Sequence, residues 1–262
     1  MQLGVRKSTQ ERRPIARIGQ IPVDAVDIQE TAHAFIDYCR SAERAKAMRP
    51  IYSTSINGQV ISRCARDRKL KESILSADWV NADGQPLVLL SRYLCANPLP
   101  ERVATTDLFP VVARLAAEAG VTFYMLGASE KVNHEAVKAA LAAYPDLRIV
   151  GRRNGYFSRS EETAVVEEIV KLKPDVLWVS LGVPLEQQFC VRNLDALRGV
   201  AIVKTAGGLL DFLSLAKPRA PPWMQRIGME WLFRVCLEPQ RLILRYLVTN
   251  PHALFLMVRD LR

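Results

Sequence analysis

The sequence predicts an α/β fold, a Rossmann-like and mostly parallel sheet with helices on both faces, plus a C-terminal helical appendage. From Ile15 to about Thr205, short β-rich runs alternate with helical patterns. This alternation is typical of a parallel sheet covered by helices. Beyond a proline-rich break near residue 216, the strand pattern stops and only helical patterns remain.

The alternating region contains six candidate strands and at least five candidate helices. Asp27 is placed to cap the first helix, with Glu30 completing a capping box. Thr106 or Asp107 is placed to cap the second. The candidate strands are 51–54, 79–81, 121–126, 148–150, 176–181 and 201–205, and the candidate helices are 28–45, 108–119, 132–144, 161–171 and 186–197.

The chain divides into three predicted parts. Residues 1–14 are basic and lack a following apolar stretch, which indicates a disordered leader rather than a secretory signal. Residues 15–215 form the Rossmann-like domain. Residues 216–262 form the helical appendage, in which Pro239 divides the helical path in two. No apolar run reaches the length of about eighteen residues that a membrane span requires.

Composition restricts the class of protein and of site. The net charge of +9 and pI near 9.5 indicate anionic partners, namely phosphates, nucleic acid or an acidic membrane surface. The five cysteines lack CxxC spacing, which favours neither disulfides nor zinc and fits a reducing cytosol. His33, His134 and His252 are far apart in sequence, so no metal site is predicted.

Asp83 is the foremost candidate for a catalytic group. A short apolar strand, Trp79-Val80-Asn81, precedes it, and Gly84 and an apolar helix follow. In open parallel sheets, reacting groups gather outside the carboxyl ends of the strands. The alternative is that Asp83-Gly84 is only a turn, since both residue types favour turns. The motif alone leaves both interpretations open.

Five predicted strands end in glycine or small polar residues just before a helix. Such loops let a ligand approach the backbone, and helix N-termini attract phosphate oxygens. They predict a crevice for a nucleotide or nucleotide sugar, although each glycine alone is compatible with an ordinary βα turn. The dinucleotide and P-loop fingerprints are absent from the sequence. The loops are Thr54-Ser55-Ile56-Asn57-Gly58, Gly127-Ala128-Ser129, Gly151 to Tyr156, Gly182-Val183-Pro184 and Gly207-Gly208.

Arginines supply candidate phosphate ligands. Arg102 precedes a predicted helix and is placed to clamp a phosphate, or else to pair with Glu101 at the surface. Arg234, Arg241 and Arg245 are spaced to share one helical face within a largely apolar segment. That segment either packs on the domain or lies in a lipid interface with its arginines at the phosphates.

Taken in order, these segments resemble the WecG/TagA/CpsF family of glycosyltransferases, which includes GumM-type exopolysaccharide enzymes. The likeness extends from about residue 18 to 245. It rests on Ser55-Ile56-Asn57, Asp83-Gly84, Glu101-Arg102-Val103, Leu181-Gly182-Val183-Pro184, Gly207-Gly208 with Asp211-Phe212, Glu230-Trp231-Leu232-Phe233-Arg234 and Glu238-Pro239-Gln240-Arg241.

The resemblance implies an inverting enzyme that needs neither metal nor cofactor. It would move a hexose-type sugar from a UDP-sugar to a polyprenyl-diphosphate-linked sugar, in exopolysaccharide, teichoic acid or related cell-surface glycan synthesis. It would be cytoplasmic and peripheral on the inner face of the cell membrane. No nucleic-acid partner is implied, and a homo-oligomer is compatible with the sequence.

The resemblance also assigns roles to residues. Asp83 matches the family's proposed catalytic base, and Arg234, Arg241 and Arg245 match an appendage thought to reach the lipid-linked diphosphate. In the mechanism that we expect, Asn57 orients a substrate and Arg102 meets phosphate charge. The family pattern Pro-Lys-Gln-Glu reads Pro184-Leu185-Glu186-Gln187 here, so whether Glu186 or Gln187 contacts the donor stays open. The predicted substrate-binding residues are Thr54, Ser55, Gly84, Gly127, Gly151, Tyr156, Gly182, Pro184, Glu186, Gln187, Gly208, Asp211, Arg234, Arg241 and Arg245.

Two other classes compete with this interpretation. One is another nucleotide-binding Rossmann-like enzyme that uses NAD or S-adenosylmethionine. The other is a nucleic-acid-binding module, suggested by the positive charge. Against the second, the basic residues lack the interleaved aromatic residues of a stacking surface.

Overall fold

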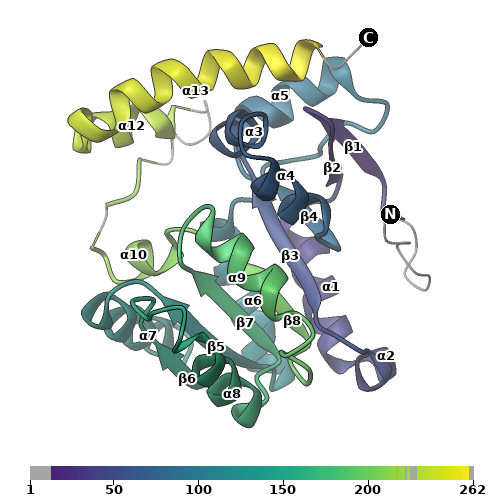
Figure 1. Ribbon diagram of the computed structural model, residues 1–262, viewed down its shortest axis with the longest axis vertical. Coiled ribbons are helices and arrows are strands. Elements are labelled where there is room, and N and C mark those ends of the chain that lie inside the picture. The colour runs from purple at the N-terminus through teal and green to yellow at the C-terminus, as the bar shows by residue number, and fades with distance from the viewer. Residues whose placement is uncertain (1–12, 217, 222, 225–228, 260–262) are drawn as a thin grey trace. The chain divides into compact units, whose positions relative to one another are not determined.

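A computed structural model describes residues 13–216, 218–221, 223–224 and 229–259 (Figure 1). The chain forms two compact units, each built from separate stretches of sequence. Unit 1 comprises residues 1–27, 55–104 and 219–262, and unit 2 comprises residues 28–54 and 105–218. The predicted leader falls almost entirely on residues 1–12, which lie outside the described ones.

The strands of the main sheet follow the order β4-β3-β8-β7-β5-β6. The pairs β3–β8, β8–β7, β7–β5 and β5–β6 are all parallel, which confirms the predicted α/β class. Strand β3 begins in unit 2, and its last residues belong to unit 1. The strands are β3 (Ile51–Ile56), β4 (Trp79–Ala82), β5 (Thr122–Gly127), β6 (Arg148–Arg153), β7 (Val176–Ser180) and β8 (Ile202–Thr205).

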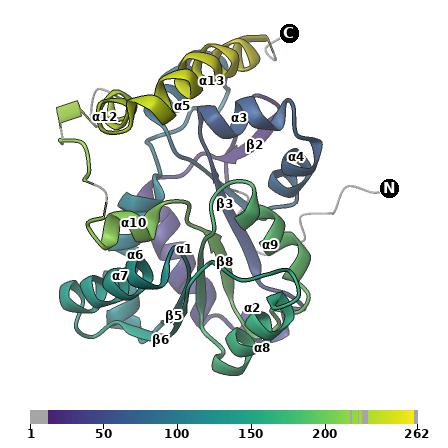
Figure 2. The ribbon, with the colours of Figure 1, turned by 60° about the vertical axis from the view of Figure 1, so that its left-hand side comes forward.

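Helices cover both faces of the sheet in unit 2. Helices α1 and α6 lie together on one face, and α8 and α9 lie on the other (Figures 1 and 2). The buried Trp178 of β7 contacts Phe35, Phe109 and Phe123, with ring centroids 5.2–6.4 Å apart. The helices are α1 (Ile28–Arg40), α2 (Ala42–Lys46), α6 (Thr105–Ala119), α7 (Glu130–Ala143), α8 (Glu162–Leu172), α9 (Leu185–Asn193) and α10 (Leu209–Leu213).

Unit 1 contains an antiparallel hairpin that the sequence analysis missed. Its turn residues Gly19 and Gln20 both have positive φ, as the favoured two-residue hairpin turn requires. The Asp24 carboxylate at the end of the hairpin accepts a hydrogen bond from the Val80 N–H of β4 at 2.7 Å. The elements of unit 1 are β1 (Ile15–Ile18), β2 (Ile21–Asp24), α3 (Gly58–Cys64), α4 (Arg68–Leu75), β4, α5 (Gln85–Leu94), α12 (Glu230–Leu237) and α13 (Pro239–Arg259).

Helix α13 is docked on α3 within unit 1. A Cβ at Gly58 would lie 3.6 Å from the Cβ of Ala253, so the two helices approach closely there. Ser62 Oγ and His252 Nδ1 are 2.9 Å apart and hydrogen-bonded. The predicted division at Pro239 is confirmed, because α12 ends at Leu237 and α13 begins at Pro239. The domain boundaries at residues 15 and 215 stay a prediction.

Three local predictions were wrong. The 28–45 helix is two helices, because Ser41 is extended and its Oγ accepts from Arg44 N–H at 3.3 Å to begin α2. Helix α6 begins at Thr105, so Thr106 and Asp107 lie inside its first turn. Gly151 lies within β6 and not in a loop. A Cβ there would be 2.5 Å from the Tyr124 ring, so this glycine serves packing.

Candidate functional site

The ends of β3 and β4 bring the main candidate residues to one edge. The Asp83 N–H donates to the Ile56 carbonyl at 2.7 Å, which holds the residue after β4 beside the end of β3. The Val103 N–H donates to the Ala82 carbonyl at 2.8 Å and anchors the segment that carries Arg102. Gly84, with φ of +154°, then turns the chain into α5. Asp83 therefore lies at a strand end, as predicted.

Asn57 has a structural task as well as a candidate chemical one. It is the N-cap of α3, and its Oδ1 accepts from the Val60 N–H at 3.0 Å. This bond fixes the side-chain conformation and occupies the carbonyl oxygen of the amide. The Nδ2 group is then the part of Asn57 that can donate a hydrogen bond to a substrate oxygen.

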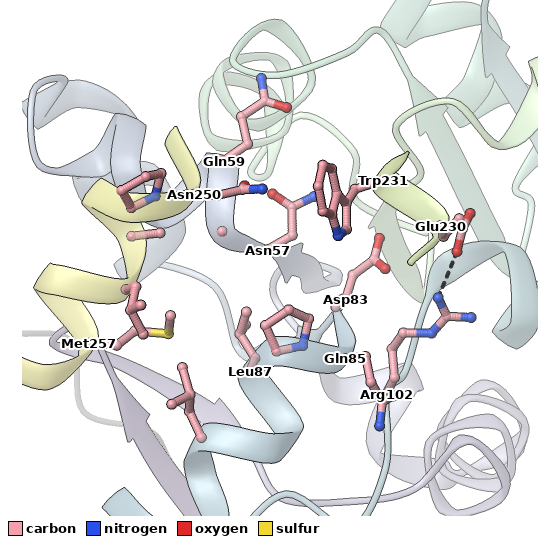
Figure 3. A pocket seen from close by; sticks show the side chains of 17 residues that line it. Asn57, Gln59, Asp83, Gln85, Leu87, Arg102, Glu230, Trp231, Asn250 and Met257 are labelled. Carbon is pink, nitrogen blue, oxygen red and sulfur yellow. Dashed lines mark hydrogen bonds and ion pairs between the residues drawn. The ribbon is translucent and has the colours of Figure 1, made fainter. Parts of the chain in front are cut away.

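Asp83 and Asn57 line a cavity of about 510 Å³ that lies entirely within unit 1. In Figure 3 the charged residues Arg102 and Glu230 lie toward one side together with Trp231, and Leu87 and Met257 lie toward the other. In this view, Asp83 lies between the Arg102–Glu230 pair and Met257. The polar lining residues are Asn57, Gln59, Asp83, Gln85, Arg102, Glu230 and Asn250, and the larger apolar ones are Pro86, Leu87, Leu90, Trp231, Pro251, Leu254 and Met257.

Arg102 pairs with Glu230 rather than with Glu101. Its guanidinium lies 2.7 Å from the Glu230 carboxylate, and both side chains are only 14% exposed. Glu230 is the first residue of α12, so this ion pair links the C-terminal helices to the segment between α5 and α6. Glu230 and Trp231 belong to a motif of the family resemblance, but neither residue was predicted to lie in the site. Both line the cavity.

We expect the Arg102–Glu230 pair to couple energetically in folding. In a double-mutant cycle with Arg102→Met and Glu230→Gln, the coupling should be about 1–3 kcal/mol, because contacting charges in a shielded site do not act additively. Urea denaturation of the four proteins measures it. The exposed pair Arg114–Glu118 is the control, for which coupling below about 0.5 kcal/mol is expected. Equal coupling in the two cycles would contradict the expectation.

Unit 2 carries the glycine loops at the carboxyl ends of β5, β7 and β8. Asn133 of α7 is buried, and its Nδ2 lies 3.0 Å from each of the carbonyls of Gly127 and Arg153. It thereby holds the ends of β5 and β6 together. Ser129 caps α7 by accepting from the Val132 N–H at 3.3 Å. The β5 loop is thus fixed on both sides.

Glu186 joins two further loops. Its Oε2 accepts from the N–H groups of Gly182, at 3.2 Å, and Gly207, at 3.0 Å. Its Oε1 accepts from Gln187 Nε2 at 3.2 Å. The side chain is buried, which raises the pKa of Glu186 to about 7 against the opposing effect of these hydrogen bonds and of Lys204. Gln187 Oε1 is also buried and has no hydrogen-bond partner among the described residues.

Glu186→Gln is expected to remove a pH dependence of stability. Because the folded-state pKa is raised, the folded protein binds more protons than the unfolded one between about pH 4.5 and 7. This contribution to stability is therefore present at low pH and falls as the pH rises toward 7, by an amount on the order of 3 kcal/mol. In the variant, the Gln187 amide can turn its Oε1 toward the new NH₂ group.

Urea denaturation of wild type and Glu186→Gln between pH 5 and 8 measures this difference. Glu167→Gln, at an exposed position of α8, is the control. The stability of wild type relative to Glu186→Gln should decline from pH 5 to 7 and level off above it. A difference that does not change with pH would show that Glu186 is ionised throughout.

The remaining predicted residues are divided among the two units. Thr54 is buried with its Oγ1 2.8 Å from Thr205 Oγ1, and Tyr156 is 82% exposed. Pro184 precedes α9, while Gly208 and Asp211 lie at the start of α10. Within the described part of the chain, no three potential ligands cluster to hold a metal. The side chains of Arg234, Arg241 and Arg245 lie outside the described structure, although their backbones belong to α12 and α13.

Comparison with known proteins gives a family and two named relatives. Residues 16–262 match the family described as "Glycosyl transferase WecG/TagA/CpsF family". A protein of Bacillus subtilis (strain 168), N-acetylglucosaminyldiphosphoundecaprenol N-acetyl-beta-D-mannosaminyltransferase, is 30% identical over 208 residues, which cover 79% of each chain. A protein of the same name from Bacillus spizizenii (strain ATCC 23059 / NRRL B-14472 / W23) is 27% identical over 190 residues, 72% of each chain.

Proposed function

This chain belongs to the WecG/TagA/CpsF family of glycosyltransferases, and we propose that it transfers a hexose-type sugar from a UDP-sugar to a polyprenyl-diphosphate-linked sugar with inversion. The observation that carries the proposal is the cavity that Asp83 and Asn57 line together with the Arg102–Glu230 pair. The names of the two relatives support an acceptor that joins N-acetylglucosamine, a diphosphate and a polyprenol. The proposed role is in cell-surface glycan synthesis.

Asp83 is the proposed general base. The oxygen of an acceptor hydroxyl attacks the anomeric carbon from the face opposite UDP, and the bond from that carbon to the β-phosphate oxygen breaks. The hydroxyl proton passes to the Asp83 carboxylate, and UDP leaves with the electron pair of the broken bond. General-base assistance of this kind contributes about 10²–10⁴-fold. Asn57 Nδ2 would orient a sugar oxygen for the attack.

The leaving UDP needs donors for its developing charge. We assign Arg102 to this task, because it is the one cation among the described residues that line the cavity. Within unit 2, the loops at Gly127, Gly182 and Gly208 consist of small residues at strand ends, which let a phosphate approach the backbone closely. Glu186 holds the Gly182 and Gly207 loops together.

A donor panel tests the proposal. Purified protein is given UDP-sugars with an N-acetylglucosamine diphosphate prenyl acceptor, and UDP release and product mass are measured. One UDP-sugar should give acceptor-dependent product whose new linkage, assigned by NMR, has the configuration opposite to that of the donor. Calorimetric titration with UDP, NAD and S-adenosylmethionine should show binding of UDP alone. Binding of NAD or S-adenosylmethionine without UDP binding would overturn the proposal.

We further propose that the outward face of α13 meets the inner face of the cell membrane. Leu244, Leu247 and Phe255 are 72%, 67% and 59% exposed, and with the half-exposed Val248 and Val258 they fall on one stripe at helical spacing. A contiguous apolar stripe on a surface helix is typical of an interaction site. Among the described helices, none is long and apolar enough to cross a membrane.

Leu244→Asp combined with Leu247→Asp should lower binding to vesicles of phosphatidylglycerol and phosphatidylethanolamine by about tenfold or more, because each buried leucine contributes about 1.5–3 kcal/mol. Co-sedimentation measures the binding. Tyr93→Asp is the control, since Tyr93 is 87% exposed on α5 and lies off this stripe. If both variants bind vesicles like the wild type, the outward face of α13 does not meet the membrane.

A further inference from the structure

One side of the cavity is apolar, and the proposed transfer reaction assigns no role to the residues there. The lining charges, Asp83, Arg102 and Glu230, lie to one side in Figure 3, whereas Leu87 and Met257 lie to the other. On that apolar side, α5 contributes Leu87 and Leu90, and α13 contributes Leu254 and Met257. Leu87 and Met257 are 1% and 5% exposed and form the buried base of this wall, whereas Leu90 is partly exposed and Leu254 is 47% exposed. Leu90 and Leu254 therefore present most of the apolar surface that a ligand could cover.

Helix α13 is apolar on the side that lines the cavity as well as on its outward stripe. Ala253 and Met257 line the cavity and are buried, whereas Phe255 belongs to the outward stripe. Leu254 follows Leu247 by seven residues and is 47% exposed, so it lies at the border between the two sides while lining the cavity. The apolar lining exceeds what docking of the outward stripe on a lipid surface requires, which points to an apolar ligand in the cavity.

The isoprenoid chain of the proposed acceptor is a hydrocarbon that could contact the apolar side of the cavity. Its reacting hydroxyl must reach Asp83, and its diphosphate joins the sugar to an isoprenoid chain. With the leaving UDP assigned to Arg102, the acceptor would extend from Asp83 toward the side of the cavity on which Leu87 and Met257 lie (Figure 3). The hydrocarbon that follows the diphosphate would then meet Leu90, Leu254 and Met257.

We infer that the wall of Leu87, Leu90, Leu254 and Met257 is a binding subsite for the first isoprenoid units of the acceptor. This inference rests on the proposed function and extends it. The enzyme would recognise the allylic end of the lipid within the cavity, independently of any membrane. Burying apolar groups there contributes to acceptor binding in proportion to the area removed from water.

Soluble acceptors test the subsite without membranes or detergent. N-acetylglucosamine diphosphate is prepared with a methyl, a geranyl or a diethylene glycol tail, the last being polar and extended. For wild type, kcat/KM should be about tenfold or more higher with geranyl than with methyl, since the geranyl tail buries several apolar carbons that the methyl tail lacks. The diethylene glycol tail should give no such gain.

Two neighbouring residues provide a matched pair of variants. Leu254 is 47% exposed and lines the cavity, whereas Phe255 is 59% exposed and does not. Leu254→Gln should lose most of the geranyl advantage, measured as the ratio of kcat/KM for the geranyl acceptor to kcat/KM for the methyl acceptor in the same variant. Phe255→Gln should keep the advantage. Leu90→Gln, on the opposite helix, should repeat the result of Leu254→Gln.

The outcomes separate the inference from the proposed function. Transfer to methyl and geranyl acceptors with equal kcat/KM would overturn the subsite and leave the transferase activity standing. Equal losses in Leu254→Gln and Phe255→Gln would place the lipid preference on the outward face and also overturn the subsite. No transfer to any of these acceptors, with any UDP-sugar of the panel, would instead contradict the proposed function.

Discussion

Asp83→Asn is expected to lower kcat by about 10²–10⁴-fold while KM for the acceptor changes little. Asparagine keeps the size and shape of the side chain but cannot take the proton of the attacking hydroxyl. The interaction that is lost develops only in the transition state, so the effect should fall on kcat. Turnover of a UDP-sugar with a soluble acceptor measures it, and the thermal unfolding midpoint checks that the variant is folded.

Asp78→Asn is the control for the substitution at Asp83. Asp78 has the same carboxylate and precedes the same strand, β4, but lies at its opposite end and outside the cavity lining. Its kcat should stay within about threefold of wild type, as for an ordinary substitution away from the chemistry. If Asp83→Asn also retains activity within a few-fold while folded, Asp83 is not the base and serves only the turn into α5.

The sheet could be predicted from the sequence because its strands are short apolar runs that end at glycine or polar residues. For β5, β7 and β8, the predicted ends differ from the observed ones by no more than one residue. The β1–β2 hairpin was missed because Gly19-Gln20 is not one of the usual two-residue turn sequences, since Gln20 seldom adopts the positive φ that this turn requires. The break at Ser41 was missed because the apolar pattern continues across it, and only the cap marks the new helix.

The candidate site was predictable where it depends on strand ends, and not where it depends on tertiary packing. Asp83 and Asn57 follow β4 and β3, so an edge shared by two strands brings them together. Glu230 meets Arg102 across 128 positions of sequence, which no local pattern specifies. Helix α13 is apolar on two faces, so its sequence could not show that Met257 faces the cavity and Phe255 does not.

The glycines of unit 2 look alike in sequence but differ in what a side chain would meet. Gly127 has φ of +133°, and a Cβ there would lie 2.2 Å from the carbonyl oxygen of Ser180. That carbonyl cannot easily move, because it accepts from the Ala128 N–H at 3.2 Å and belongs to the pairing of β5 with β7. Gly120 has φ of +70°, but a Cβ there meets nothing within 4 Å among the described residues.

Gly127→Ala is therefore expected to reduce the free energy of unfolding by more than about 4 kcal/mol, because backbone strain and a clash with backbone act together. Gly120→Ala, which adds strain without a clash, should cost about 1–2 kcal/mol. Urea denaturation compares the two, and hydrogen exchange of the β5 and β7 amides follows the separation of these strands if Gly127→Ala is too unstable to titrate. If Gly127→Ala lowers the free energy of unfolding no more than Gly120→Ala does, β5 and β7 can separate locally at this point. The glycine loop after β5 would then be able to adapt its conformation and would not be rigid.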